Sequence, residues 1–412
     1  MTVWTPEWSL TVDGSTNYSN LTLADVTVTS GRTDIYSQAT AGYASFTILN
    51  FDDSAVTLDI NQSVAIRVKN SAGTYVNLFG GYVTDIDVEV SMSGTGGLIQ
   101  NMRVIALGAL AKLPKTLTNG VLTQDLDGVQ IYDVLAPILY DQWNEVAPAL
   151  QWNAYNPTTN WTNANNSGLG EIDSGNYELA NRSSDKTDVY SLIAALANSG
   201  LGYLYEDNQG RICYADSTHR NSYLAANGYT SVSGGNAYAQ GIKTSKKSGD
   251  IRNNVTVTYS SGSHTASDSQ SIAIYGYQAQ DIQTTLKHSA DALSQANFYL
   301  GIRAFPEAQF RTITFPLGNP DIDNGDRDAL LTVFMGLALE ITDLPANIAG
   351  GRFQGFVEGW SFRASYNGLA VTLTVSPTAY SLQAAHWDDV SVLEKWNTLG
   401  TTLDWNDAII VA

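Results

Sequence analysis

Short stretches in which apolar and polar residues alternate recur along this chain, and they constrain its fold more than any other feature. The clearest is Ser63-Val-Ala-Ile-Arg-Val-Lys69, in which every second side chain is apolar or small. Such a period of two places one set of side chains on each face of a half-buried strand. Between residues 21 and 112 we expect about six strands of this kind, separated by turns such as Asn70–Gly73 and Ser91–Gly97. This spacing predicts a small β-barrel or sandwich.

Residues 113–235 mix helical periodicity with strands and predict an α/β unit. The segment 128–145 places apolar residues at a helical period. The segment 184–200 begins with residues that cap helices and ends at Gly200, a helix C′ position that tolerates positive φ. A β-hairpin follows at 201–215.

Strands return after this unit, and the region 236–382 predicts a second β-barrel with a helical insertion. Alternation predicts strands at Asn254–Tyr259 and Ser271–Tyr275, and more strands between Phe310 and Val375. The insertion, at about 286–305, contains a helix predicted from Ser289 to Ala304, which stops before a proline.

Charge and composition exclude several classes of function. Acidic residues outnumber basic ones by 40 to 21, which gives a formal net charge of −19. Such a chain is a poor non-specific binder of nucleic acid, because phosphate contacts need clustered lysine and arginine. No stretch of about 18 apolar residues occurs, so we expect no membrane span. The N-terminus lacks the basic and apolar regions of a secretory signal, which indicates synthesis in a cytoplasm.

The single cysteine, Cys213, excludes an intramolecular disulfide framework and a thiolate zinc cluster. It lies in an alternating strand and is expected to be a small buried residue. Charged residues make up only 15% of the chain, while Ser, Thr, Asn, Gly and Tyr are abundant. This balance favours a β-rich protein with surfaces that other subunits cover.

No motif for nucleophilic catalysis is present, and we predict no catalytic residue and no cofactor. His219, beside Asp216 and Arg220, could form a local pair, but a histidine after a hairpin is expected to be a polar surface residue. Glu358, beside Trp360, is the least implausible acid for glycoside hydrolysis. We expect it instead to be a carboxylate on an edge strand.

Two charged clusters have both a binding and a structural interpretation. The acidic cluster places four aspartates within eight residues: Asp321, Asp323, Asp326 and Asp328. A calcium loop is one interpretation, but Gly325 is out of phase with the EF-hand and no glutamate stands at the twelfth position. A solvated turn is favoured, no metal site is predicted, and cation binding by this loop stays open. The basic cluster, Lys243–Lys247 with Arg252, is expected to protect an edge strand or loop rather than to bind an acidic partner or a membrane.

Tryptophans mark both ends of the chain in polar surroundings. Trp4 and Trp8 lie in the first 20 residues, and three others follow one another at intervals of nine: Trp387, Trp396 and Trp405. Each ring can bury on the order of 200 Å². We predict that these five residues bind neighbouring proteins, with residues 1–20 acting as an arm that docks on a partner.

Several phrases together resemble the central tail-hub proteins of tailed bacteriophages. They are Val28-Thr-Ser-Gly-Arg-Thr-Asp34 followed by 41–50, Leu78-Phe-Gly-Gly-Tyr-Val-Thr-Asp-Ile86, the helix–hairpin element at 195–212, and Gly355-Phe-Val-Glu-Gly-Trp-Ser-Phe362 with its neighbours 341–345 and 373–377. The resemblance covers roughly residues 21–382 and depends on the joint order of the phrases. The tail around Trp387 resembles those of minor tail proteins of actinobacterial phages with long non-contractile tails.

The resemblance implies a mainly β fold with an α+β insert, in which two β-barrels are joined by a helix-containing α/β domain. The expected units are an N-terminal arm (1–20), a first β-barrel (21–112), an α/β domain (113–235), a second β-barrel (236–382) and a tryptophan-rich tail (383–412).

The resemblance also implies a structural, non-enzymatic role in the virion, at the tail tip, after synthesis in the bacterial host's cytoplasm. Three chains would form a ring that imitates six-fold symmetry, joins the tail tube to a three-fold tip and lines the channel for genome ejection. The implied partners are two further copies of the chain, the distal tail protein, the C-terminus of the tape-measure protein and downstream tail-tip or fibre proteins. DNA would only pass through.

Three alternatives remain at this point. The chain could be a distal tail protein, whose ring is hexameric. Its many tryptophans and tyrosines could instead belong to a carbohydrate-binding host adhesin. Peptidoglycan hydrolysis is the third.

Overall fold

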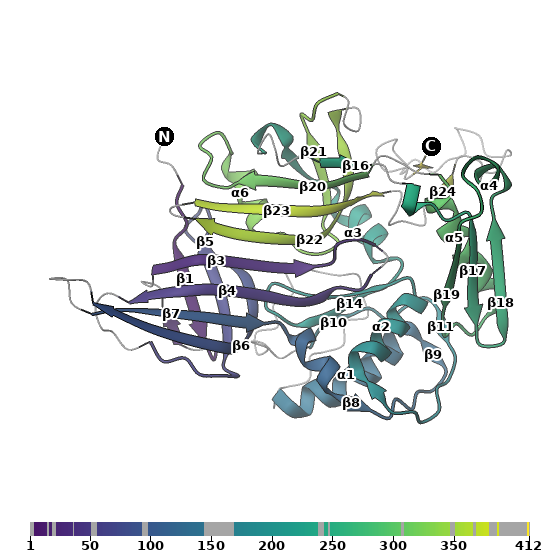
Figure 1. Cartoon of the computed structure of the whole chain (residues 1–412), viewed down its shortest axis with the longest axis horizontal. Coiled ribbons are helices and arrows are strands. Elements are labelled where there is room, and N and C mark those ends of the chain that lie inside the picture. Colours follow the sequence, from purple (N-terminus) through teal and green to yellow (C-terminus); the bar gives the residue numbers. More distant parts are fainter. Residues whose placement is uncertain are drawn as a thin grey trace.

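The computed structural model of the chain (Figure 1) describes these residues: 4–14, 16–18, 22–35, 37–50, 56–92, 98–143, 169–237, 243–245, 248–305, 309–346, 351–365, 368–378, 385–386 and 410–411. Within them, thirteen strands form one sheet, and several smaller sheets and helices pack beside it. The prediction of a mainly β fold with a helix-containing insert is therefore confirmed.

The first part of the large sheet comes from the N-terminal quarter of the chain. Its strands are β1 (Trp8–Val12), β2 (Thr16–Tyr18), β3 (Thr22–Gly31), β4 (Thr40–Asn50), β5 (Ser63–Lys69), β6 (Tyr75–Met92) and β7 (Leu98–Leu107). Alternation predicts the bounds of β5, because one face of this strand is covered by the core and the other is not.

The second part of the sheet comes from residues far along the chain. Its strands are β15 (Thr230–Ser233), β16 (Lys243–Ser245), β20 (Gln309–Pro316), β21 (Ala338–Thr342), β22 (Phe353–Ser365) and β23 (Gly368–Pro377). The path runs β16-β20-β23-β22-β3-β4-β7-β6-β5-β1-β2, and β21 joins β15 to β22. The two sets of strands predicted as two barrels thus meet directly where β22 pairs with β3 (Figure 1).

Two glycines permit this meeting. Gly31 pairs with Gly359, and Gly31 has a φ of +89°, which favours glycine. A Cβ on Gly31 would lie 2.4 Å from the carbonyl oxygen of Glu358, and one on Gly359 would lie 2.7 Å from that of Arg32. The backbones of β3 and β22 therefore approach too closely for any side chain at these positions.

Residues 8–12 differ from the arm predicted at 1–20. They form β1, which pairs with β5 along its whole length inside the large sheet. The reason is the alternation of Trp8, Leu10 and Val12, which turn toward the main core and are at most 9% exposed.

The middle of the chain forms the α/β unit. Its elements are the 3-10 helix η2 (Ala109–Lys115), β8 (Leu117–Thr118), β9 (Asp125–Leu126), α1 (Asp127–Trp143), β10 (Leu169–Ile172), β11 (Glu178–Leu179), β12 (Thr187–Asp188), α2 (Val189–Ser199), β13 (Tyr203–Glu206) and β14 (Ile212–Ala215). Helix α3 (His219–Asn227) follows. The two predicted helices and the predicted hairpin are confirmed.

The end of α2 corrects one prediction. Gly200 has a φ of −84°, and the left-handed residue is Leu201, with a φ of +53°. Gly200 is needed for space, because a Cβ there would lie 2.4 Å from Oδ2 of Asp127 and 2.7 Å from the hydroxyl of Tyr214.

A further unit stands apart from the large sheet. Its elements are β17 (Asn254–Tyr259), β18 (Gly262–Ser267), α4 (Ser269–Tyr275), β19 (Ala279–Gln283) and α5 (Ser289–Arg303). The three strands pair only with one another among the described residues, and they share a hydrophobic core with the α/β unit (Figure 1). This unit lies between β16 and β20 in the chain and is larger than the helical insertion predicted at about 286–305. The predicted helix itself is confirmed as α5.

Helix α4 replaces the strand predicted at Ser271–Tyr275, which was wrong. The carboxylate of Asp268 caps the helix by accepting the N–H of Ser271, and Gly276, with a φ of +76°, ends it. These caps stabilise a short helix despite the alternating sequence between them. Among the described residues, no helix is long and apolar enough to span a bilayer.

Candidate functional site: a buried ionic junction

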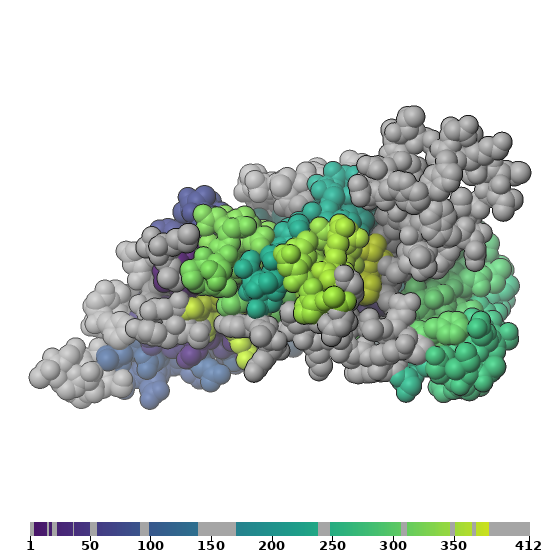
Figure 2. Space-filling view, turned by 90° about the horizontal axis from the view of Figure 1, so that it is seen from above, coloured from purple at the N-terminus to yellow at the C-terminus, as the bar shows by residue number. Residues whose placement is uncertain are grey.

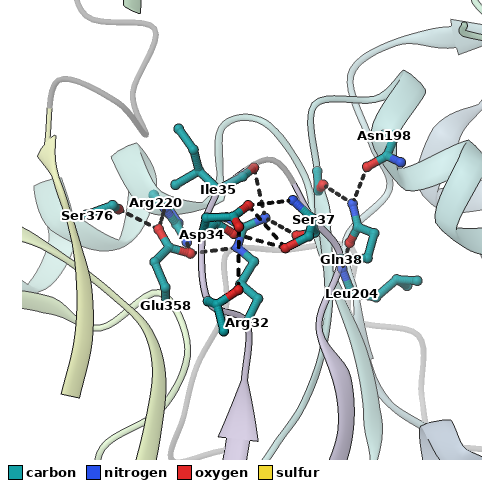
Figure 3. Close-up of polar contacts among 12 residues, drawn as sticks. Arg32, Asp34, Ile35, Ser37, Gln38, Asn198, Leu204, Arg220, Glu358 and Ser376 are labelled. Carbon is teal, nitrogen blue, oxygen red and sulfur yellow. Dashed lines mark hydrogen bonds and ion pairs between the residues drawn. The ribbon is translucent and has the colours of Figure 1, made fainter. Parts of the chain in front are cut away.

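The meeting of β3 and β22 contains a buried cluster of charged groups (Figure 3). Nε of Arg32, just beyond β3, donates to Oε2 of Glu358 on β22 at 2.7 Å. Arg220 on α3 donates to both oxygens of the same carboxylate, at 2.8 and 2.9 Å. Ser376 on β23 donates its hydroxyl to Oε1. Glu358 is 1% exposed, and groups from three other places in the fold converge on it: the residue after β3, α3 and β23.

A β-bulge places the carboxylate there. The register between β22 and β23 shifts between Val357 and Gly359, so that Glu358 is the extra residue of its strand. A bulge changes the direction of a side chain relative to regular alternation. The prediction of an edge-strand carboxylate was wrong, because β22 has β23 on one side and β3 and β21 on the other.

The two arginines decide the ionisation state of this group. Burial raises the pKa of a carboxyl, but Arg220 and Arg32 outweigh burial and hold the pKa of Glu358 well below its usual range. The carboxylate accepts four hydrogen bonds and carries no proton at neutral pH. It therefore cannot serve as the proton donor of a glycosidase.

The α/β unit covers this cluster with an aromatic ring. Tyr203 on β13 lies under both guanidinium groups, with Cζ of Arg220 4.5 Å and Cζ of Arg32 5.1 Å from the ring centre. A small pocket of about 70 Å³ opens beside these three residues. Its other lining includes Gln38, whose amide donates to Asn198 at 2.7 Å (Figure 3).

Glu206 makes a second buried joint, at the end of β13. Its carboxylate accepts the N–H of Gly42 on β4 at 2.7 Å and the N–H of Leu110 on η2 at 2.6 Å. Burial raises the pKa of Glu206 to about 7, against the effect of these two hydrogen bonds. The joint fixes the α/β unit to the first part of the large sheet.

Asp127, the first residue of α1, makes a third joint inside the α/β unit. Oδ1 accepts the N–H groups of Asn176 at 2.9 Å and Tyr177 at 2.8 Å, and Oδ2 accepts the hydroxyl of Tyr214. Burial raises the pKa of Asp127 to about 7, although the hydrogen bond from Tyr214 lowers it.

His219 is buried rather than on the surface, so that prediction was wrong. Its Nδ1 lies 2.6 Å from Oδ2 of Asp173, which follows β10, and the side chain is 4% exposed. The side chain of Asp216 accepts the N–H and hydroxyl of Thr218, and its backbone carbonyl accepts the N–H of His219 at 3.3 Å. The sequence could not give Asp173 as the partner, because it lies 46 residues away.

Cys213 is buried as predicted, with 1% of its surface exposed. Burial raises the pKa of its thiol, so the nucleophilic thiolate is disfavoured. Among the described residues, no three His, Cys, Asp or Glu side chains are placed to hold a metal ion.

The acidic cluster is a helix start rather than a solvated turn. Asp323 caps α6 (Asn324–Leu331) by accepting the N–H of Asp326 at 2.7 Å. Asp326 accepts the N–H of Ser233, and Asp328 accepts that of Ser71 at 2.8 Å. These aspartates thus point to different partners. The basic cluster begins on β16, which, among the strands that the structure describes, lies at an edge of the large sheet, in agreement with the expected edge strand or loop.

The predicted anchor residues are separated by the structure. Trp8 belongs to the main core with 9% of its surface exposed, which leaves little of the ring for a partner. Trp4 is half-buried and lies 5.6 Å from the guanidinium of Arg327. The other three, Trp387, Trp396 and Trp405, lie outside the described residues.

The sequence matches no family model and no curated protein. Its structure is similar to the tail protein from Neisseria meningitidis MC58, with a TM-score of 0.58 and 12% identity, over 92% of this chain and 100% of that one. It is also similar to the 43 kDa tail protein of prophage MuSo2 from Shewanella oneidensis, with a TM-score of 0.53 and 13% identity, over 91% of this chain and 99% of that one. The chain thus shares its fold with these two tail proteins, in agreement with the resemblance noted in the sequence.

Proposed function

We propose that this chain is a structural subunit of a phage tail, a hub at the distal end that acts without catalysis. The observation that carries the proposal is the fold, which matches two tail proteins over nearly their whole length. A non-enzymatic role is supported by Glu358, whose carboxylate already accepts four hydrogen bonds, and by Cys213, whose thiol is buried and has a raised pKa.

In this proposal three copies form a ring that adapts the six-fold tail tube to a three-fold tip. The large sheet supports it, since each chain contributes two sets of strands joined by the β3–β22 pair. The ionic junction around Glu358 would hold the two sets at a fixed angle, as a ring with a constant radius requires. The ring would line the channel through which DNA passes, and an acidic lining would let DNA slide without binding.

The proposed partners are the distal tail protein, the tape-measure C-terminus and a downstream tip or fibre protein. The tryptophans of residues 383–412 and the half-buried Trp4 are the proposed anchors for such neighbours. The site of action is the virion, at the tail tip.

The mass of the purified assembly tests this function. We expect native mass spectrometry to give three copies of the 44.4 kDa chain, and electron microscopy to show rings with three-fold symmetry and a central hole. Six copies would support a distal tail ring instead. A monomer that binds glycans on an array would support an adhesin, and clearing of cell walls in a zymogram would support a hydrolase.

A further inference from the structure

The outer part of β6 has a free edge. Residues 75–82 of β6 pair with β5, pairing with β7 begins at Tyr82, and two backbone hydrogen bonds join Val83 to Asn61 and Gln62. From Thr84 onward its one strand partner among the described residues is β7. Figure 1 shows β6 and β7 extending beyond the rest of the sheet, and Figure 2 shows their blue residues at the end of the molecule away from α4 and α5. Among the described residues, no strand pairs with the other side of this segment.

The two faces of this extension differ in chemistry. Val88 and Val90 are 49% and 58% exposed, although a residue before them on the same face, Ile86, pairs with the fully buried Val104. The apolar face of the main core therefore continues into solvent here. The opposite face carries three exposed carboxylates, those of Asp85, Asp87 and Glu89.

An exposed apolar strand edge of this kind promotes association with another strand. The bound strand must match the apolar face and the acidic face at the same time. Pairing with the same edge of a second copy is disfavoured, because it would bring the carboxylates of two chains together. Arg103, opposite Asp87, offsets only one of the three charges. The complement is a strand with apolar residues beside the valines and basic residues beside the carboxylates.

We propose that the edge of β6 from Thr84 to Val90 binds an extended segment of another tail protein by strand addition, and that this segment alternates apolar residues with lysine or arginine. Backbone hydrogen bonds would supply affinity, and the alternating faces would set register and direction. That the partner is a tail protein rests on the proposed function. The edge and its two faces do not depend on it.

A labelled nine-residue peptide that alternates lysine and valine, with both ends blocked, is the probe. We expect it to bind the full chain in a fluorescence anisotropy titration. The same peptide with N-methylated backbone amides should not bind, because it cannot pair with an edge. A peptide of the same composition with lysines and valines in separate blocks should bind at least about tenfold more weakly, because alternation is lost.

Three variants of the chain locate the site. The triple change D85N/D87N/E89Q should weaken binding about tenfold, and V88T/V90T about threefold, since threonine keeps the strand propensity of valine. The matched control D185N/D281N/D321N removes the same charge from exposed positions elsewhere and should change binding less than about twofold. Circular dichroism checks that each variant is folded.

Several results would overturn the proposal. They are absence of binding, equal binding of the N-methylated peptide, and equal weakening by the control triple. If the chain forms trimers but fails this test, the docking edge is rejected and the proposed hub stands. If the chain is monomeric yet passes, the edge stands and the proposed hub falls.

Discussion

The buried carboxylates that join the parts of this fold are of two kinds, which differ in the charge of their hydrogen-bond donors. Glu358 faces two arginines at the meeting of the two strand sets, whereas Glu206 and Asp127 face only N–H groups and a hydroxyl. All three are at most 4% exposed. The pKa of Glu358 is held below its usual range, and those of Glu206 and Asp127 are raised to about 7.

This difference teaches that burial alone does not fix the charge of a joint. A cation within hydrogen-bond distance outweighs desolvation, while dipoles from two or three donors do not. The junction between the strand sets is therefore permanently charged at neutral pH. The joints of the α/β unit titrate within the physiological range.

The largest effect is expected from Glu358→Ala, which leaves two arginines buried without their anion. We expect it to lower the free energy of unfolding by about 3–5 kcal/mol, measured by urea denaturation. The matched control is Glu340→Ala on the neighbouring strand β21, whose ion pair with Arg352 is solvent-exposed on the arginine side. This control should lose less than about 1 kcal/mol. Similar losses for both variants would show that the junction carries no special stability.

The second effect is a dependence of the free energy of unfolding on pH, which comes from Glu206 and Asp127, the two carboxyls without a cationic partner. Their folded-state pKa values, about 7, lie above the ordinary 4.5 of Glu206 and 3.8 of Asp127, so the folded state holds protons that the unfolded state has released. Stability should then fall as pH rises from about 4 to 7, by at most about 3 kcal/mol for Glu206 and about 4 kcal/mol for Asp127.

Urea titrations at pH 5 and pH 8 measure this dependence. The variants Glu206→Gln and Asp127→Asn should each be less stable than the wild type at pH 5 and should each remove part of the slope. The sign for Glu358 is opposite, because its lowered pKa makes stability fall only in acid below its ordinary value of 4.5. A wild-type curve that is flat between pH 5 and 8 would contradict the raised pKa values.

The smallest effect is expected when one hydroxyl donor is removed from each kind of carboxylate and the losses in the free energy of unfolding are compared. Tyr214→Phe removes the donor to Asp127, and Ser376→Ala removes one of four to Glu358. We expect a loss of about 1–2 kcal/mol for Tyr214→Phe at pH 8, smaller at pH 5, where the carboxyl is protonated. Ser376→Ala should lose about 0.5–1 kcal/mol at both pH values, because Arg32 and Arg220 remain. Equal pH dependence in the two variants would remove the distinction between the joints.

Much of the fold is predictable from local sequence. Alternation gives the strands of both sets because burial of one face requires a period of two, and helical spacing with an aspartate cap gives α2. The prediction fails at 271–275, where the caps Asp268 and Gly276 stabilise a helix instead of a strand. It also fails at Gly200. Glycine is required there because a Cβ would collide with Asp127, and not because the helix ends with a positive φ.

The candidate site was visible only in part. The phrases around Gly31-Arg32 and Gly359 contribute to the resemblance to tail hubs, and in the structure they contact each other. The sequence signal for Glu358 is a charged residue within an otherwise apolar run, which is typical of a paired buried carboxylate. Nothing in either phrase identifies the other as its partner.

The sequence by itself determined the mainly β class, the bounds of several strands and of α5, the strong negative charge and the resemblance to phage tail hubs. These follow from patterns within ten or so residues, where side-chain period and capping act. Only the tertiary structure decided that β3 pairs with β22, and that Arg32 meets a carboxylate 326 residues away. Alternation predicts which face of a strand is buried. Every strand offers the same backbone N–H and C=O groups to a neighbour, so which two strands pair is decided by the packing of the complete chain.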